Sequence, residues 1–317
     1  MTRVASEAPP EQPPAPLTLR EAVPLVHALV AHVAQEAGVR VLFIKGPVLQ
    51  RQYLRSGDHA SVDVDVLVSP DRFGDLCRAL ESAGWRDAQV LETPSIVPSH
   101  SATYRHVRWE CSVDVHRLFP GFLADPQLVF DALWRSRTTV EIAGRELPTC
   151  DRPGSAAVAA LHYLRDSRDA HRARQLDELV GWVRRGFDAH SLTELSELAA
   201  ETGAADTLRP FLRRVGAPLP AADPSPAEAW HAWRLRSETP DLTSLAWLLA
   251  LRRGPVRRWP GLLSKALFLS EAELRAKSPS MASGRLPVLR ARVARLRRGL
   301  RALPAAASAV SRMERAA

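Results

Sequence analysis

Residues 61–68 read Ser-Val-Asp-Val-Asp-Val-Leu-Val, and this alternation restricts the fold more than any other segment. Successive side chains of a β-strand point to opposite faces of a sheet, so Asp63 and Asp65 share one face while the valines between them enter a core. Two adjacent carboxylates on a buried strand repel each other and need compensation. Divalent cations such as Mg²⁺ take oxygen ligands of this kind. The segment predicts a metal-binding strand, with an edge strand whose polar face is solvated as the alternative.

The segments around this strand predict a mixed α/β unit followed by helices. The apolar periodicity changes from continuous or alternating runs to helical spacing at about residue 151. The expected elements are a helix over residues 17–37, a strand at 41–44, a helix from Gly46 to about Arg55, a helix over 72–83, strands over 102–107 and 109–118, and helix cores at 161–165, 176–183, 192–200 and 242–251.

Length and composition predict more than one unit. We expect a disordered Pro-rich lead at residues 1–16, an α/β domain at 17–150, an α-helical domain at 151–284 and a basic amphipathic tail helix at 285–317. The sequence has no apolar stretch of 18 residues, and its three cysteines are scattered without a CxxC motif. These features favour a cytoplasmic protein with reduced thiols.

A second alternating segment supplies a third carboxylate. In Ser112-Val113-Asp114-Val115-His116, Asp114 and His116 share the face opposite the two valines. Carboxylates on adjacent strands can hold two metal ions roughly 3.5–4 Å apart, the arrangement used for in-line displacement at phosphorus. The Lys45-Gly46 turn offers backbone N–H groups, a helix N-terminus and an ammonium charge to phosphates. We expect His116 to orient the carboxylate of Asp114 rather than to bind a metal.

These motifs resemble a known family when they are taken in order. Lys45-Gly46, the Asp63-x-Asp65 strand and the strand with Asp114 and His116 resemble the uncharacterised bacterial nucleotidyltransferase-like family, of the DNA polymerase beta-type nucleotidyltransferase superfamily. The resemblance implies an α/β (α+β) mixed sheet with flanking helices, followed by an α-helical C-terminal domain. Tyr53 matches a tyrosine of the family's helix after the Lys-Gly turn.

The resemblance also implies roles for individual residues. Asp63 and Asp65 would bind metal, with Asp114 as the third ligand, and these three aspartates would form the catalytic set. The nucleotide-binding residues would be Lys45, Gly46 and His59, the last at the place of an arginine in the family. In the helical half, His162, Leu176 and Asp177 match positions that face the cleft.

The activity implied is a metal-dependent nucleotidyltransferase, which transfers a nucleoside monophosphate from an NTP such as ATP and releases pyrophosphate. Its cofactor would be two Mg²⁺ ions, or Mn²⁺, and its acceptor a hydroxyl or phosphate of a small molecule, a peptide or a protein. His59 and Pro47 depart from the family pattern. They favour an alternative, a nucleotide-binding or scaffold protein that has little or no turnover.

The C-terminal region carries the excess positive charge. Residues 252–301 hold fourteen Lys and Arg side chains against two Glu, whereas the whole chain has a net charge of +8. Arginines surround an apolar stripe of Leu289, Val293, Leu296 and Leu300. A basic amphipathic helix of this kind binds anionic membrane surfaces or nucleic acid. The alternative is a terminal helix that packs its leucine stripe on the domain.

Overall fold

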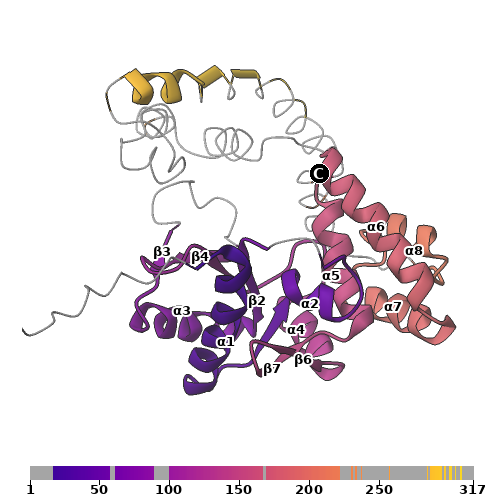
Figure 1. Ribbon diagram of the computed structural model, residues 1–317. Coiled ribbons are helices and arrows are strands. Elements are labelled where there is room, and N and C mark those ends of the chain that lie inside the picture. The colour runs from indigo at the N-terminus through magenta and orange to yellow at the C-terminus, as the bar shows by residue number, and fades with distance from the viewer. Residues whose placement is uncertain are drawn as a thin grey trace, which may run out of the picture.

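The structure is a computed structural model of the 317-residue chain, shown in Figure 1. It describes residues 17–57, 61–88, 100–166 and 169–221. Beyond residue 221 it describes the segment 286–294 and a few positions on either side of it, namely 230, 233, 237, 257, 284, 296, 297, 300, 301, 304 and 308. His59, the Pro-rich lead and the helix expected at 242–251 lie outside the described residues.

The described strands form one mixed sheet with the order β3-β4-β5-β2-β1-β7-β6. The strands are β1 (Val41–Ile44), β2 (Asp63–Val68), β3 (Arg86–Asp87), β4 (Ser101–Arg105), β5 (Ser112–His116), β6 (Thr138–Ile142) and β7 (Arg145–Thr149). β2 runs antiparallel to β1 and parallel to β5, so the strand with the paired aspartates lies at the centre of the sheet. This position rules out the alternative of a solvated edge strand.

Helices cover both faces of the sheet. They are α1 (Leu19–Glu36), α2 (Gly46–Arg51), α3 (Phe73–Ser82) after a 3₁₀ turn η1 (Pro70–Arg72), α4 (Pro126–Arg135), α5 (Arg152–Leu164), α6 (Ala170–Gly186), α7 (Ala189–Glu201) and α8 (Arg209–Val215). α1 and α3 pack on one face, where Val64, Val66 and Val68 enter the core. On the other face Leu67 joins a core that continues through α4 and α5 into α6–α8 (Figure 1).

The two faces of β2 therefore have different partners. The three valines within the strand lie against α1 and α3, whereas Val62, which precedes the strand, is exposed. The aspartates lie on the face that Leu67 shares with α5 and the helices beyond it. Burial of apolar side chains on both sides of a strand fixes its register, because a shift by one residue would exchange the two faces. This register directs Asp63 and Asp65 toward the helical half.

The expected fold class is confirmed: a mixed seven-stranded sheet with flanking helices precedes a helical region, α5–α8. The predicted helix to Arg55 is shorter than expected, since α2 ends at Arg51 and Tyr53 has a left-handed φ of 58°. The sequence interpretation also missed α4 and the β6–β7 hairpin. The division into separate α/β and helical domains stays a prediction.

No helix in the described part of the chain is both long enough and apolar enough to cross a membrane.

Candidate functional site

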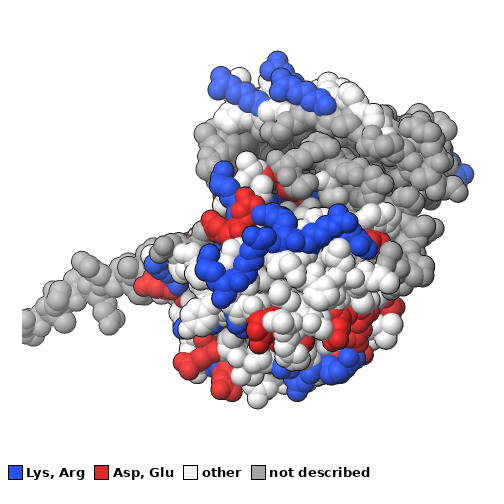
Figure 2. Space-filling model, turned by 90° about the vertical axis from the view of Figure 1, so that its right-hand side faces the viewer, with Lys and Arg blue, Asp and Glu red and all other residues white. Residues whose placement is uncertain are grey.

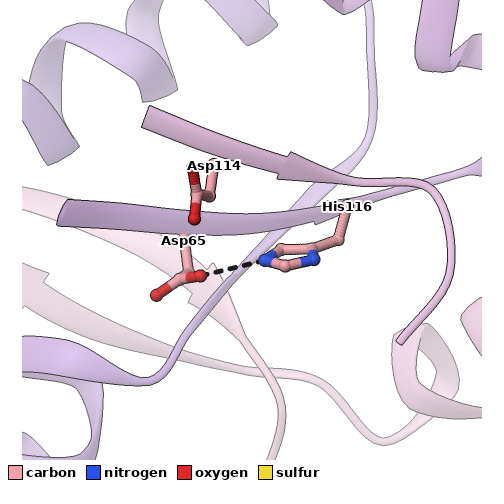
Figure 3. A group of neighbouring side chains, drawn as sticks. All are labelled: Asp65, Asp114 and His116. Carbon is pink, nitrogen blue, oxygen red and sulfur yellow. Dashed lines mark hydrogen bonds and ion pairs between the residues drawn. The ribbon is translucent and has the colours of Figure 1, made fainter. Parts of the chain in front are cut away.

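Asp65, Asp114 and His116 lie together on β2 and β5, as Figure 3 shows. The parallel register places Asp65 directly opposite Asp114. One potential ligand atom from each of the three side chains lies within 4.8 Å of the other two. The site forms because two alternating strands pair in parallel and turn their polar faces the same way.

Lys45 neutralises Asp65. Its Nζ atom lies 2.5 Å from Oδ1 of Asp65, and both side chains are largely buried. Lys45 is placed at the junction between β1 and α2, where its backbone has a positive φ of 61°. Such a conformation is strained for a residue with a side chain and persists where the surrounding structure holds it. The strained turn directs the ammonium at the carboxylate strand.

His116 contacts a different aspartate from the one expected. Its Nε2 donates a hydrogen bond to Oδ1 of Asp65 at 2.9 Å, so the prediction that it orients Asp114 is wrong. The parallel register pairs His116 with Leu67, two residues beyond Asp65 on the same face of β2. The imidazole therefore reaches diagonally across the ladder to Asp65. With Lys45 it gives this carboxylate two cationic or donor partners.

The two aspartates of β2 have opposite electrostatics. Burial would raise the pKa of Asp65, but Lys45 and His116 outweigh burial and hold this pKa well below its ordinary value. Burial and the neighbouring charge of Asp65 raise the pKa of Asp63 to about 6, although Lys45 lowers it in part. Asp63 lies on the predicted face of β2, but it does not belong to the group formed by Asp65, Asp114 and His116. A further cation near Asp63 would relieve the repulsion that raises its pKa.

A cavity of about 170 Å³ opens beside these carboxylates, between β2, α2 and the helices α5 and α6. Its wall contains the predicted residues Lys45, Gly46, Asp63, Asp65 and His162. A Cβ atom on Gly46 would lie 2.9 Å from Oγ of Ser61, and the φ of Gly46 is +44°. Only glycine fits this place without strain, because it tolerates both the positive φ and the close approach.

Four polar or aromatic residues of the cavity were missed in the sequence: Arg55, Ser61, Tyr163 and Gln175. Ser61 could have been found, because the two-residue period of the strand places it on the face of Asp63 and Asp65. Arg55 and Gln175 follow no local pattern. Nε of Arg55 is buried without a hydrogen-bond partner. Arg55 therefore offers a donor next to the carboxylates.

The three cleft residues predicted in the helical half differ in outcome. Leu176 is buried in the apolar core and does not line the cavity. His162 on α5 lines the cavity, and its Nδ1 atom is buried without a hydrogen-bond partner. Burial, followed by the nearby positive charge of Lys45, lowers the pKa of His162 to about 2, so the imidazole is neutral. Asp177 instead forms an ion pair with Arg214 at 2.6 Å on the exposed side of the helices. Tyr53 is 73% exposed and does not line the cavity.

The side chains present suit a hard divalent cation. Oδ1 of Asp114 is buried and has no hydrogen-bond partner, which is costly for a carboxylate unless a cation or water satisfies it. Asp65 lies opposite it in the ladder and supplies a second set of oxygen atoms. Carboxylate oxygens are the preferred protein ligands of Mg²⁺ and Mn²⁺. Asp65 and Asp114 would hold such an ion, and Asp63 lines the same cavity as Asp65.

Comparison with solved structures finds distant similarities. A nucleotidyltransferase-like antigenic protein from Paracoccidioides brasiliensis is 15% identical, with a TM-score of 0.40 over 66% of this chain and 98% of that one. The antibiotic-resistance factor ANT(2'')-Ia is 13% identical, with a TM-score of 0.37 over 60% and 94%. A nucleotidyltransferase toxin from Mycobacterium tuberculosis H37Rv is 15% identical, with a TM-score of 0.34 over 87% and 93%.

Comparison of the sequence with protein families is more informative. No curated protein matches the chain. A family model described as uncharacterised nucleotidyltransferase matches residues 25–220, which include the whole sheet, the carboxylate group and α5–α8. The matched segment is more than half of the 317 residues. This chain therefore belongs to the uncharacterised nucleotidyltransferase family.

Proposed function

We propose that this protein transfers a nucleoside monophosphate from an NTP to a hydroxyl or phosphate oxygen of an acceptor. In this reaction the acceptor oxygen forms a bond to the α-phosphorus, and the bond from that phosphorus to the β-phosphate oxygen breaks to release pyrophosphate. The observation that carries the proposal is the pairing of Asp65 with Asp114 beside a cavity that also contains Lys45 and Gly46.

Within this proposal the aspartates have distinct tasks. Asp65 and Asp114 would hold one divalent ion, and Asp63, which lines the cavity, would provide oxygens for a second ion. Bound ions of this type neutralise phosphate charge and lower the pKa of an attacking hydroxyl. His116 fixes the orientation of Asp65 through its hydrogen bond. Neither His116 nor His162 is needed as a metal ligand.

The size and lining of the cavity support a site for the phosphates of the nucleotide. A volume of about 170 Å³ is smaller than the roughly 300–1,000 Å³ of sites that enclose a drug-sized ligand. The nucleoside would therefore lie outside it. Lys45 and Arg55 provide positive charge on two sides, and the absent side chain of Gly46 leaves room for close approach to the backbone.

Calorimetry tests the nucleotide site. We expect wild-type protein to bind ATP only with Mg²⁺ present. Asp65→Asn and Asp114→Asn should each lower this affinity by about 10-fold or more, since loss of even an outer-shell partner of a metal ligand costs that much. The matched control is Asp177→Asn, which removes one carboxylate from a surface ion pair and should leave the affinity unchanged. Equal affinity in wild type, Asp65→Asn and Asp114→Asn would refute the site.

Transfer of label separates an enzyme from a nucleotide-binding scaffold. Two features favour a protein that binds nucleotide without turnover. Lys45 forms an ion pair with Oδ1 of Asp65, and Pro47 next to the turn lacks a backbone N–H. We expect α-labelled ATP, Mg²⁺ and a cell extract to give a labelled acceptor in the presence of wild-type protein and not of Asp65→Asn. Tight ATP binding with neither label transfer nor pyrophosphate release would favour the scaffold.

A further inference from the structure

The helix near the C-terminus exposes its apolar stripe, for which the sequence left packing on the domain as an alternative. Five apolar residues recur at intervals of three and four along one side and are 40–67% exposed: Leu286, Leu289, Val293, Leu296 and Leu300. The helix, yellow in Figure 1, lies away from the sheet and from α5–α8. The alternative in which the stripe packs on the domain is therefore wrong for these side chains.

One flank of the stripe faces inward and the other outward. On the inward flank Val288 is only 7% exposed and Nε of Arg292 is buried. On the outward flank three arginines lie beside the stripe and line one shallow hollow together with the first part of the stripe: Arg290, Arg297, Arg301, Leu286, Leu289 and Val293. The helix thus presents a strip of leucines bordered by a row of arginines.

The charge of this helix has a single sign. Residues 286–301 contain six arginines and no Asp or Glu. Figure 2 shows basic side chains, and among the described residues no acidic ones, at the end of the molecule where this helix lies. A surface that joins apolar and cationic side chains in this way is complementary to one that offers hydrocarbon beneath negative charge.

We propose that this helix lies on the surface of an anionic lipid bilayer. The leucine stripe enters the boundary between headgroups and acyl chains, and the arginines of its outward flank bind lipid phosphates and carboxylates. Arginine side chains suit this depth because their aliphatic parts cover apolar surface while the guanidinium stays with the headgroups. This inference is independent of the nucleotide site.

Other occupants fit less well. The intervals of three and four are also those of a coiled coil, but pairing two copies along this stripe would bring their Arg290 and Arg297 rows together, and like charges at these positions oppose association. Nucleic acid would bind the arginines through its phosphates and leave the five apolar side chains in water. A bilayer satisfies both parts of the surface.

Co-sedimentation of the full chain with vesicles tests the proposal. We expect binding to vesicles of phosphatidylcholine with about 30% phosphatidylserine, and at least about 10-fold weaker binding to phosphatidylcholine alone, since the acidic lipid attracts juxtaposed Arg side chains. Raising NaCl from 0.1 to 1 M should weaken binding, because the Debye length falls from about 10 to about 3 Å.

Two variants separate the apolar and the charged contributions. Leu289→Ser/Leu296→Ser and Arg290→Gln/Arg297→Gln/Arg301→Gln should each lower vesicle binding at least about 10-fold, as expected when one of two anchoring signals is lost. The matched controls alter exposed residues elsewhere: Leu25→Ser/Leu128→Ser and Arg20→Gln/Arg174→Gln/Arg213→Gln. Both controls should bind like wild type, and circular dichroism confirms the fold of every variant.

Several results would overturn the proposal. One is wild-type protein that does not sediment with the acidic vesicles. Another is a loss of binding in the arginine controls as large as in the helix variant, which would indicate nonspecific attraction of a basic protein.

A third is tight binding to a DNA or RNA duplex that depends on the helix arginines and not on Leu289 and Leu296, together with equal vesicle binding by all variants. A dimer in sedimentation velocity that Leu289→Ser/Leu296→Ser dissolves would assign the stripe to a second copy.

Discussion

Asp63 and Asp65 are two residues apart on one strand face, yet their surroundings separate their protonation. Lys45 and His116 both contact Oδ1 of Asp65 and keep it ionised. Asp63 has burial and a like charge beside it, and its pKa rises to about 6. The two aspartates on this face of β2 therefore differ in protonation, because only one of them has cationic partners.

This asymmetry predicts a pH-dependent gain in stability for Asp63→Asn. The folded protein holds the Asp63 proton more tightly than the unfolded chain does, so Asp63 destabilises the fold as the pH rises from about 4 to about 6. In EDTA at pH 7, Asp63→Asn should be more stable than wild type by about 1–3 kcal/mol. Urea unfolding at pH 7 and pH 4 measures this difference. A gain that is equally large at pH 4 would contradict the assignment.

Lys45→Met should have opposite effects on metal and nucleotide. Its ammonium occupies an oxygen that a divalent ion would use, so removing it should raise the affinity for Mn²⁺ alone. The affinity for ATP with Mg²⁺ should fall about 10-fold, since one charge-assisted contact to phosphate is worth roughly 1.5–3 kcal/mol. Calorimetry measures both, and Lys45→Arg is the charge-matched control. A fall in both affinities would show that Lys45 only supports the fold of the site.

At the scale of elements, the site depends on two junctions. β2 and β5 pair in parallel, which aligns Asp65 with Asp114, and the turn from β1 into α2 brings Lys45 and Gly46 to the same place. The first junction joins strands that are distant in the chain, whereas the second is a turn between consecutive residues that the fold carries to the carboxylate strand. The turn is the less tolerant of the two, because Lys45 and Gly46 both have positive φ.

Gly46→Ala tests this turn. Its Cβ would meet Ser61 Oγ at 2.9 Å at a φ of +44°, whereas a Cβ on Gly57 would meet nothing within 4 Å. We expect Gly46→Ala to cost about 1–3 kcal/mol of unfolding free energy, in the range for strained backbone, and Gly57→Ala to cost much less. Denaturant unfolding of both variants measures the difference. Equal stabilities would mean that the turn relaxes without cost.

At the scale of the whole molecule, one apolar core joins the sheet to the helices. Leu42 and Leu67 of the sheet belong to the same cluster as Leu179 of α6 and Phe211 of α8. The cavity lies along this junction, because β2 and α2 supply one wall and His162 and Tyr163 of α5 supply another.

The continuous core predicts that the sheet and α5–α8 unfold as one unit. Phe211→Ala should destabilise the protein by about 3–5 kcal/mol, the usual cost for a buried phenylalanine. Hydrogen exchange should then lose protection in β1 and β2 as well as in α8. Loss confined to α5–α8 would instead support the two separate domains expected from the sequence.

Local patterns predicted most of the elements near the site. The two-residue alternation identified β2 and β5 and the shared face of their aspartates, and the apolar periodicity identified α1, β1 and α3. The β6–β7 hairpin was missed because its alternation is weak and its outer strand is mostly exposed. α4 was missed although Asp125 caps it with Pro126 in its first turn, which is a recognisable helix start.

The sequence by itself determined which carboxylates share a strand face, because a two-residue period is a property of the strand alone. Only the tertiary structure decided which of them act together. Asp65 joins Asp114 through the parallel register, His116 reaches Asp65 and not Asp114, and Arg55 and Gln175 reach the cavity from distant segments. The C-terminal stripe is a similar case. The sequence predicts the spacing of its apolar residues, but their exposure depends on what packs against the helix. Contacts between distant segments follow from packing and charge in three dimensions, which no local pattern of residues contains.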